Sequence, residues 1–129
     1  MAMKNRIITL LSCQPLWQLV LLVSVIAVLY LATTSETYSV PASANDKINH
    51  FIAFLELTLL AFLAWPGARL LYVAPPLLLF GLLIEVVQSF LPYREFSLLD
   101  VAADGTGIVV GIALWHGLFR KLVMVGSTD

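Results

Sequence analysis

The sequence predicts an all-α integral membrane protein built from four transmembrane helices. Hydrophobic residues make up 60% of the 129 residues and charged residues only 12%, a composition too apolar for a chain whose surface faces water. The apolar residues fall into four stretches of about 17 to 22 residues, and a helix of that length crosses a hydrocarbon core of about 30 Å. Four strands cannot close a barrel, and an open sheet would leave edge amides unpaired in lipid, so the spans are helices.

The first predicted span, 16–32, contains no charged residue and follows a short lead of mixed polarity that carries Lys4 and Arg6. We interpret it as a retained anchor rather than a cleaved signal peptide, because further apolar spans follow it. Threonine, serine, proline and asparagine gather over 33–45, and this composition predicts a loop.

The remaining spans are separated by strong turn signals. The second, 48–65, ends at the pair Pro66-Gly67, and the third, 70–91, ends before Pro92. The third also contains Pro75-Pro76, which should kink it unless neighbouring helices satisfy the carbonyl groups that lose their donors. The fourth span, 98–119, is followed by two basic residues and a short polar tail.

Composition also excludes several classes of protein. The formal net charge of -1 leaves no basic field that would bind nucleic acid. Cys13 is the single cysteine, which excludes an internal disulfide and a multi-thiolate metal site. The sequence contains no repeat and no segment of clearly different composition, so residues 1–129 are predicted to form one domain.

The basic residues near the span ends predict the orientation in the membrane. With a cytoplasmic amino terminus, only Lys47 and Arg94 of the seven cations lie outside. The other five lie inside: Lys4, Arg6, Arg69, Arg120 and Lys121. Both termini are therefore predicted to be cytoplasmic.

This topology brings the polar ends of three helices together in the outer leaflet. The second helix begins there, the third ends there and the fourth begins there. The candidate binding residues that we expect to meet are Asp46, Lys47, His50, Glu85, Gln88, Arg94, Asp100 and Asp104.

Helical spacing places some of these residues on shared faces. Asp46 and His50 are four residues apart, although a polar group at a helix start also serves as a cap. Asp100 and Asp104 lie on one stripe with Gly107 and Gly111, two glycines predicted to let another helix approach closely. A helix-start anion favoured by the helix dipole explains Asp100 but explains Asp104 poorly, because Asp104 lies a full turn deeper.

Two glutamates lie within predicted spans, where a carboxylate is costly and should face protein or water. Glu85 precedes Gln88 by three residues, and the simplest alternative to a binding role is an ion pair with Arg94 between helices. Glu56 lies near the middle of the second span, where a proton-handling role is the functional alternative.

The polar residues resemble the pattern of a known family, the VanZ-like membrane proteins. The matching residues lie between 46 and 115 and are Asp46-Lys47 with His50-Phe51, Glu85-x-x-Gln88, Arg94, and Asp100 followed by Gly107 and Gly111. One departure is Asp104, where the family usually has asparagine. The resemblance implies a bacterial cytoplasmic (inner) membrane and a role at the cell envelope, because the founding member is associated with low-level resistance to the glycopeptide teicoplanin.

Three functions are compatible with these residues. The leading hypothesis is a non-enzymatic or transport-like factor that binds the phosphate-bearing headgroup of an envelope lipid or lipoglycopeptide through Lys47, Arg94 and His50. The second is an intramembrane enzyme that uses His50 with one carboxylate as acid and base, although no recognised catalytic motif is present. The third is a structural or partner-recruiting membrane protein, in which an oligomer is also possible.

The sequence assigns no metal site and leaves any cofactor open. A divalent cation held by Glu85, Asp100 and Asp104 would suit the preference of hard metals for oxygen ligands, but no motif demands one.

Overall fold

The computed structural model describes residues 1–34 and 43–126, with the side chains of 43–45 and 125–126 outside the description. Its elements are α1 (Ala2–Leu11), α2 (Gln14–Thr33), α3 (Ser43–Ala64), α4 (Leu70–Ser89), α5 (Leu98–Leu114), a short π-helix η1 (Trp115–Phe119) and α6 (Arg120–Gly126). All secondary structure in these ranges is helical, which confirms the predicted all-α class. Four helical segments are long and apolar enough to cross a membrane: Gln14–Thr33, Asp46–Ala64, Leu70–Ser89 and Leu98–Met124.

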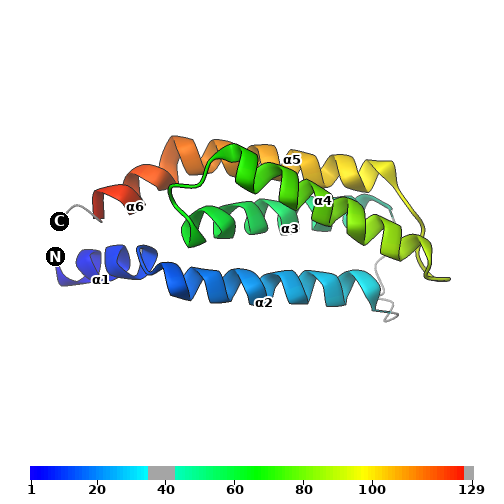
Figure 1. Cartoon of the computed structure of the whole chain (residues 1–129), viewed down its shortest axis with the longest axis horizontal. Coiled ribbons are helices and arrows are strands. Elements are labelled where there is room, and N and C mark those ends of the chain that lie inside the picture. Colours follow the sequence, from blue (N-terminus) through cyan, green and yellow to red (C-terminus); the bar gives the residue numbers. More distant parts are fainter. Residues whose placement is uncertain (35–42, 127–129) are drawn as a thin grey trace.

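The four long helices lie side by side along one axis (Figure 1). Both chain termini lie at one end of this bundle, together with α1 and α6. The start of α3 and the connection between α4 and α5 lie at the opposite end.

Helical structure reaches beyond the predicted spans: α3 begins at Ser43, inside the predicted loop 33–45, and two further segments lie near the chain ends. The lead of mixed polarity forms α1 over residues 2–11, a run that contains neither glycine nor proline. Pro15 then falls in the first turn of α2. At ten residues, α1 is too short to cross a bilayer. The fourth helix continues past 119 through α6, because Arg120 and Lys121 are good helix formers and do not end it.

Pro75 and Pro76 lie inside α4, which nevertheless continues as one helix from Leu70 to Ser89. They fall early in the helix, where each removes one hydrogen bond to the preceding turn. The two prolines therefore change the hydrogen bonding of α4 without dividing it.

The most extensive helix contact joins α3 to α5. Gly107 faces α3, and a Cβ atom added there would collide with the carbonyl oxygen of Phe51. A Cβ added at Gly111 would lie 2.8 Å from the Cβ of Thr58. Small residues bring helix backbones together in lipid, where packing rather than the hydrophobic effect drives association. The two glycines therefore set how closely α3 and α5 approach.

The bundle has one hydrophobic core, and α2 lies at its edge. Phe62 of α3 stacks on Trp115 with ring centroids 5.4 Å apart, and both side chains are buried. None of the residues of α2 is buried. Two polar contacts join α2 to α3: Gln18 Nε2 donates to Ala64 O at 3.3 Å and Ser24 Oγ donates to Glu56 Oε1 at 3.2 Å.

Candidate functional site

Six of the eight candidate binding residues converge at the end of the bundle opposite the termini. We call this group the end cluster; it comprises Asp46, Lys47 and His50 of α3, Glu85 of α4, and Asp100 and Asp104 of α5. It contains four carboxyl groups against one ammonium and one imidazole. Three consecutive helices therefore share one polar site.

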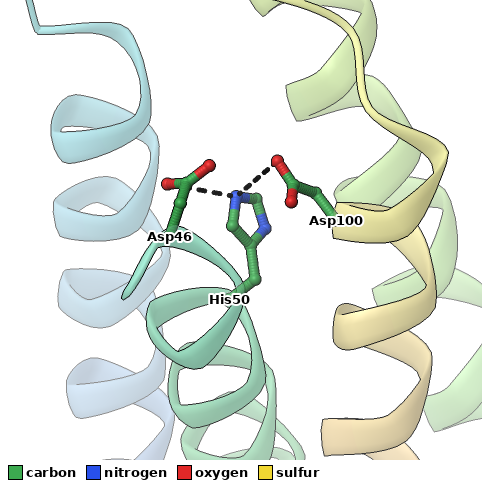
Figure 2. A group of neighbouring side chains, drawn as sticks. All are labelled: Asp46, His50 and Asp100. Atoms are coloured by element: carbon green, nitrogen blue, oxygen red, sulfur yellow. Dashed lines mark ion pairs between the residues drawn. The ribbon is translucent and has the colours of Figure 1, made fainter. Parts of the chain in front are cut away.

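His50 lies at the centre of the end cluster. Its Nδ1 is 2.8 Å from Asp104 Oδ1, which is hydrogen-bonding distance. Its Nε2 faces Asp100 Oδ2 at 3.7 Å, Glu85 Oε1 at 3.8 Å and Asp46 Oδ1 at 4.0 Å, all longer than a hydrogen bond. Figure 2 shows the carboxylates of Asp46 and Asp100 on either side of this nitrogen. The imidazole is thus hydrogen-bonded through one nitrogen, while the other faces three carboxylates.

The start of α5 explains why the Asp100 carboxylate is directed into the end cluster. Ser97 is the N-cap residue, and its side chain accepts a hydrogen bond from Asp100 N at 3.3 Å. In a capping box, the acid at the position of Asp100 would in turn accept from the N–H of the cap. Here Glu85 Oε2 accepts from Ser97 N at 3.0 Å instead. Glu85 thereby ties α4 to α5, and the Asp100 carboxylate faces His50 and Lys47.

Burial increases with depth in the end cluster. The side chains of Asp46 and Lys47 are 43% and 34% exposed, His50 is 10% exposed, and those of Glu85 and Asp104 are 0% exposed. Lys47 Nζ lies 3.5 Å from Asp100 Oδ1, a contact at ion-pair rather than ideal hydrogen-bond distance. Asp46 and Lys47 therefore form the mouth of the cluster, and the deeper carboxylates form its floor.

Three buried carboxylate oxygens in the end cluster have no hydrogen-bond partner: Glu85 Oε1, Asp100 Oδ1 and Asp104 Oδ2. A buried acceptor without a donor costs about 1–3 kcal/mol, and more when it is charged. The side chains of the cluster thus leave three buried acceptor atoms without donors, which destabilises the fold.

Gly81 and Ser97 belong to the site but were not among the predicted residues. A Cβ added at Gly81 would lie 2.6 Å from Asp104 Oδ2, so glycine at this position makes room for the aspartate. The available signals were a lone glycine inside an apolar span and a serine three residues before Asp100.

The other two candidates, Gln88 and Arg94, lie apart from the end cluster at the carboxyl end of α2. Gln88 Nε2 donates to Ala32 O at 2.9 Å, and Arg94 Nη2 donates to Leu31 O at 3.3 Å and Thr34 O at 3.5 Å. Tyr93, also absent from the prediction, donates to Thr33 O at 2.7 Å. The last carbonyls of a helix have no partners within it, so these three side chains cap α2.

The alternative pairing of Glu85 with Arg94 is not seen among the described residues, because Glu85 accepts from Ser97 and Arg94 donates to α2. Glu56 also lies outside the cluster and bonds to Ser24. Asn45, the last residue of the predicted loop 33–45, has its side chain outside the described residues.

A cavity of about 610 Å³ lies elsewhere, between α2, α3 and α4. Its lining contains Leu21, Trp65, Tyr72 and Pro76 and includes no charged side chain. None of the residues of the end cluster lines this apolar cavity.

The family model described as VanZ/LLP1 matches residues 3–120. The chain belongs to the VanZ/LLP1 family. It is also 34% identical over 80 residues to an uncharacterized protein of Schizosaccharomyces pombe, and the match covers 59% of this chain and 49% of that protein. The chain thus spans about half the length of the curated relative that it matches. No solved structure gives a significant match.

These matches bear on location as well as family. This VanZ/LLP1 protein is a multi-pass membrane protein by its four apolar helices. A protein of Schizosaccharomyces pombe is similar to part of this chain, so similarity to the chain is not confined to bacteria. The bacterial inner membrane therefore stays a prediction.

Proposed function

We propose that this VanZ/LLP1 protein binds the polar headgroup of a membrane lipid at the end cluster, in the outer leaflet. The observation that carries the proposal is the mouth of the cluster, where an acid and a base, Asp46 and Lys47, are the most exposed members. An ammonium suits a phosphate as a point charge, and a carboxylate suits an ammonium. The pair therefore matches a headgroup that carries both a phosphate and an ammonium.

Charge balance argues against a headgroup that is only anionic. The end cluster contains four carboxyl groups but only Lys47 and His50 as bases, because Arg94 caps α2 instead. A bare phosphate would face this excess of negative charge at short range. A headgroup ammonium beside Asp46, or a cation between the carboxylates and the phosphate, removes the repulsion.

Direct lipid binding tests the proposal. Purified protein is mixed with phosphatidylethanolamine, which carries phosphate and ammonium, or with phosphatidylglycerol, which carries phosphate alone. Phosphatidylethanolamine is expected to bind more tightly, and Lys47→Gln and Asp46→Asn are each expected to weaken it about 10-fold, or about 1.4 kcal/mol. Native mass spectrometry of the protein–lipid complexes gives the ratio.

Two exposed residues outside the cluster provide matched controls for these neutral variants. Lys121→Gln and Glu95→Gln remove the same charges from α6 and from the α4–α5 connection. Both are expected to bind lipid as the parent protein does. Equal binding of the two lipids, unchanged by Lys47→Gln and Asp46→Asn, would contradict headgroup recognition at this site.

One observation favours a second candidate, an intramembrane enzyme acting on an envelope lipid. The 2.8 Å contact between His50 Nδ1 and Asp104 Oδ1 is the arrangement that orients a histidine for acid–base chemistry. Its other nitrogen faces carboxylates rather than open space, so binding is the better supported function. Turnover of a labelled lipid in the same mixtures, abolished by His50→Ala, would favour catalysis.

The orientation decides which leaflet supplies the headgroup, and cysteine labelling tests it. In a Cys13→Ser background, Glu95→Cys lies at the cluster end and Gly67→Cys in the turn between α3 and α4. We expect a membrane-impermeant maleimide to label the first variant in intact cells and the second only after the cells are opened. The reverse pattern would move the end cluster to the cytoplasmic leaflet.

A narrower form of the proposal concerns lipoglycopeptides, which join a lipid tail to a polar group. The family resemblance to a teicoplanin-resistance protein supports this form. Expression in a susceptible bacterium would then raise the inhibitory concentration of teicoplanin, and Lys47→Gln would abolish the increase.

A further inference from the structure

We propose that the end cluster binds a divalent transition-metal ion, such as Zn²⁺ or Mn²⁺, between His50 Nε2 and the carboxylates of Asp46 and Asp100. The inference deepens the proposed headgroup function and rests on it for treating the end cluster as a binding site. Metal binding is nevertheless measured in the absence of added lipid, so the two proposals succeed or fail separately.

The distances around His50 Nε2 carry the first step. One ligand atom each from Asp46, His50 and Asp100 lie within 4.8 Å of one another. Ligands of one ion at metal–ligand distances of about 2.0–2.2 Å lie at most about 4.4 Å apart, so a small inward movement closes the site. Nε2 is 3.7 Å from Asp100 Oδ2 and 4.0 Å from Asp46 Oδ1. These separations are too long for hydrogen bonds and suit an ion lying between the atoms (Figure 2).

The second step is the orientation of the imidazole. A histidine that binds a metal usually donates its other ring N–H to a carboxylate, which fixes the tautomer and turns the free lone pair toward the ion. His50 Nδ1 lies 2.8 Å from the fully buried Asp104 Oδ1. With the proton on Nδ1, the lone pair of Nε2 is directed at Asp46 and Asp100. Asp104 is then a positioning residue for the ligand histidine.

The third step is an independent observation, a buried carboxylate oxygen of Glu85 that is directed into the cluster. Glu85 Oε1 is fully buried, has no hydrogen-bond partner and lies 3.8 Å from His50 Nε2. Its companion oxygen is occupied by Ser97 N, so the carboxylate is held with one oxygen directed into the cluster. An ion beside Nε2 would take this oxygen as a further ligand. It would also offset the negative charge that Lys47 alone does not balance.

The donor set points to the class of metal. One imidazole nitrogen with two or three carboxylate oxygens suits Zn²⁺ or Mn²⁺, whereas Mg²⁺ and Ca²⁺ prefer oxygen alone. Asp46 is 43% exposed at the mouth, so the ion has a path of entry. An ion held there would also face the phosphate of a bound headgroup, which links the two proposals.

Metal binding is tested on the complete, tag-free protein in detergent. The protein is stripped with a chelator, and Zn²⁺, Mn²⁺ or Mg²⁺ is added alone. We expect one Zn²⁺ or Mn²⁺ ion per chain and no comparable uptake of Mg²⁺. We also expect a higher melting temperature with the bound ion, since a ligand of the folded state stabilises it. Mass spectrometry of desalted protein and Mn²⁺ paramagnetic resonance measure the uptake, and thermal unfolding in the same detergent measures the melting temperature.

Three cluster variants are expected to lose affinity to different degrees. His50→Gln and Asp46→Asn each remove a proposed ligand and should weaken binding at least 100-fold and 10-fold, respectively. Asp104→Asn removes only the charge of the carboxylate that orients His50, and such supporting groups contribute about 10- to 100-fold to metal affinity. Asp46→Asn lies at the exposed mouth, so it tests the site even if His50→Gln folds poorly.

Two variants outside the cluster complete the design. His116→Gln and Glu95→Gln are expected to bind the ion as the parent protein does. The inference would be overturned if Asp46→Asn and His50→Gln took up as much metal as the parent protein. It would also be overturned if the stripped parent protein took up no metal. Metal uptake without lipid selectivity would contradict only the headgroup proposal, and lipid selectivity without metal uptake would contradict only this inference.

Discussion

Replacing Gly107 with alanine is expected to destabilise the bundle by about 1–3 kcal/mol and to open the end cluster. The added Cβ would collide with the carbonyl oxygen of Phe51 and lie 3.0 Å from Leu55 N. These are backbone atoms, so a rotamer change cannot relieve the collision and α5 must move away from α3. Asp104 lies three residues before Gly107 on the same face, so its contact with His50 should lengthen as well.

Gly105, two residues earlier on the same helix, provides the matched control. A Cβ added there meets only Leu78 Cδ1, at 4.0 Å. Gly105→Ala is therefore expected to be neutral or slightly stabilising, because alanine favours a helix over glycine by about 1 kcal/mol. The melting temperatures of the three purified proteins in one detergent give the comparison. Similar values for Gly107→Ala and Gly105→Ala would contradict the assigned helix contact.

The four spans could be predicted because hydropathy over a full membrane crossing is a strong signal. The predicted bounds of the third span, 70–91, differ from α4 by two residues at one end. α1 was missed because ten residues of mixed polarity do not form an apolar stretch of membrane length. The extension through α6 was missed because Arg120 and Lys121 mark an interface without ending a helix.

The convergence of charges could be argued from the order of the helix ends, but the partners could not. Which residues face His50 depends on how each helix is rotated about its axis, and that rotation is set by contacts such as Gly81 against Asp104. Arg94 and Gln88, which were expected to meet these residues, contact the end of α2 for a second reason. The carbonyls at the end of α2 also need donors, and the sequence does not place that end beside α4.

Replacing His50 with phenylalanine is expected to cost about 3–5 kcal/mol of stability, because it leaves the buried carboxylate of Asp104 without its partner. The double variant His50→Phe, Asp104→Leu removes both polar groups and keeps side chains of similar size. Exchanging a buried pair for apolar residues is often neutral, so the double variant should recover most of the loss. Unfolding of all three proteins in detergent with chelator present measures this coupling without any contribution from bound metal.

The protein's second histidine shows whether the effect belongs to the end cluster. His116 is exposed; its Nδ1 lies 3.1 Å from Ile112 O, and its ring packs edge-on against the Phe62 ring, with centroids 5.4 Å apart. His116→Phe removes no partner from a buried charge and is expected to change stability by less than about 0.5 kcal/mol. If the double variant at His50 and Asp104 were no more stable than His50→Phe alone, the loss would come from packing at position 50. The imidazole would then not hold the buried carboxylates together, and the end cluster would lose the group at its centre.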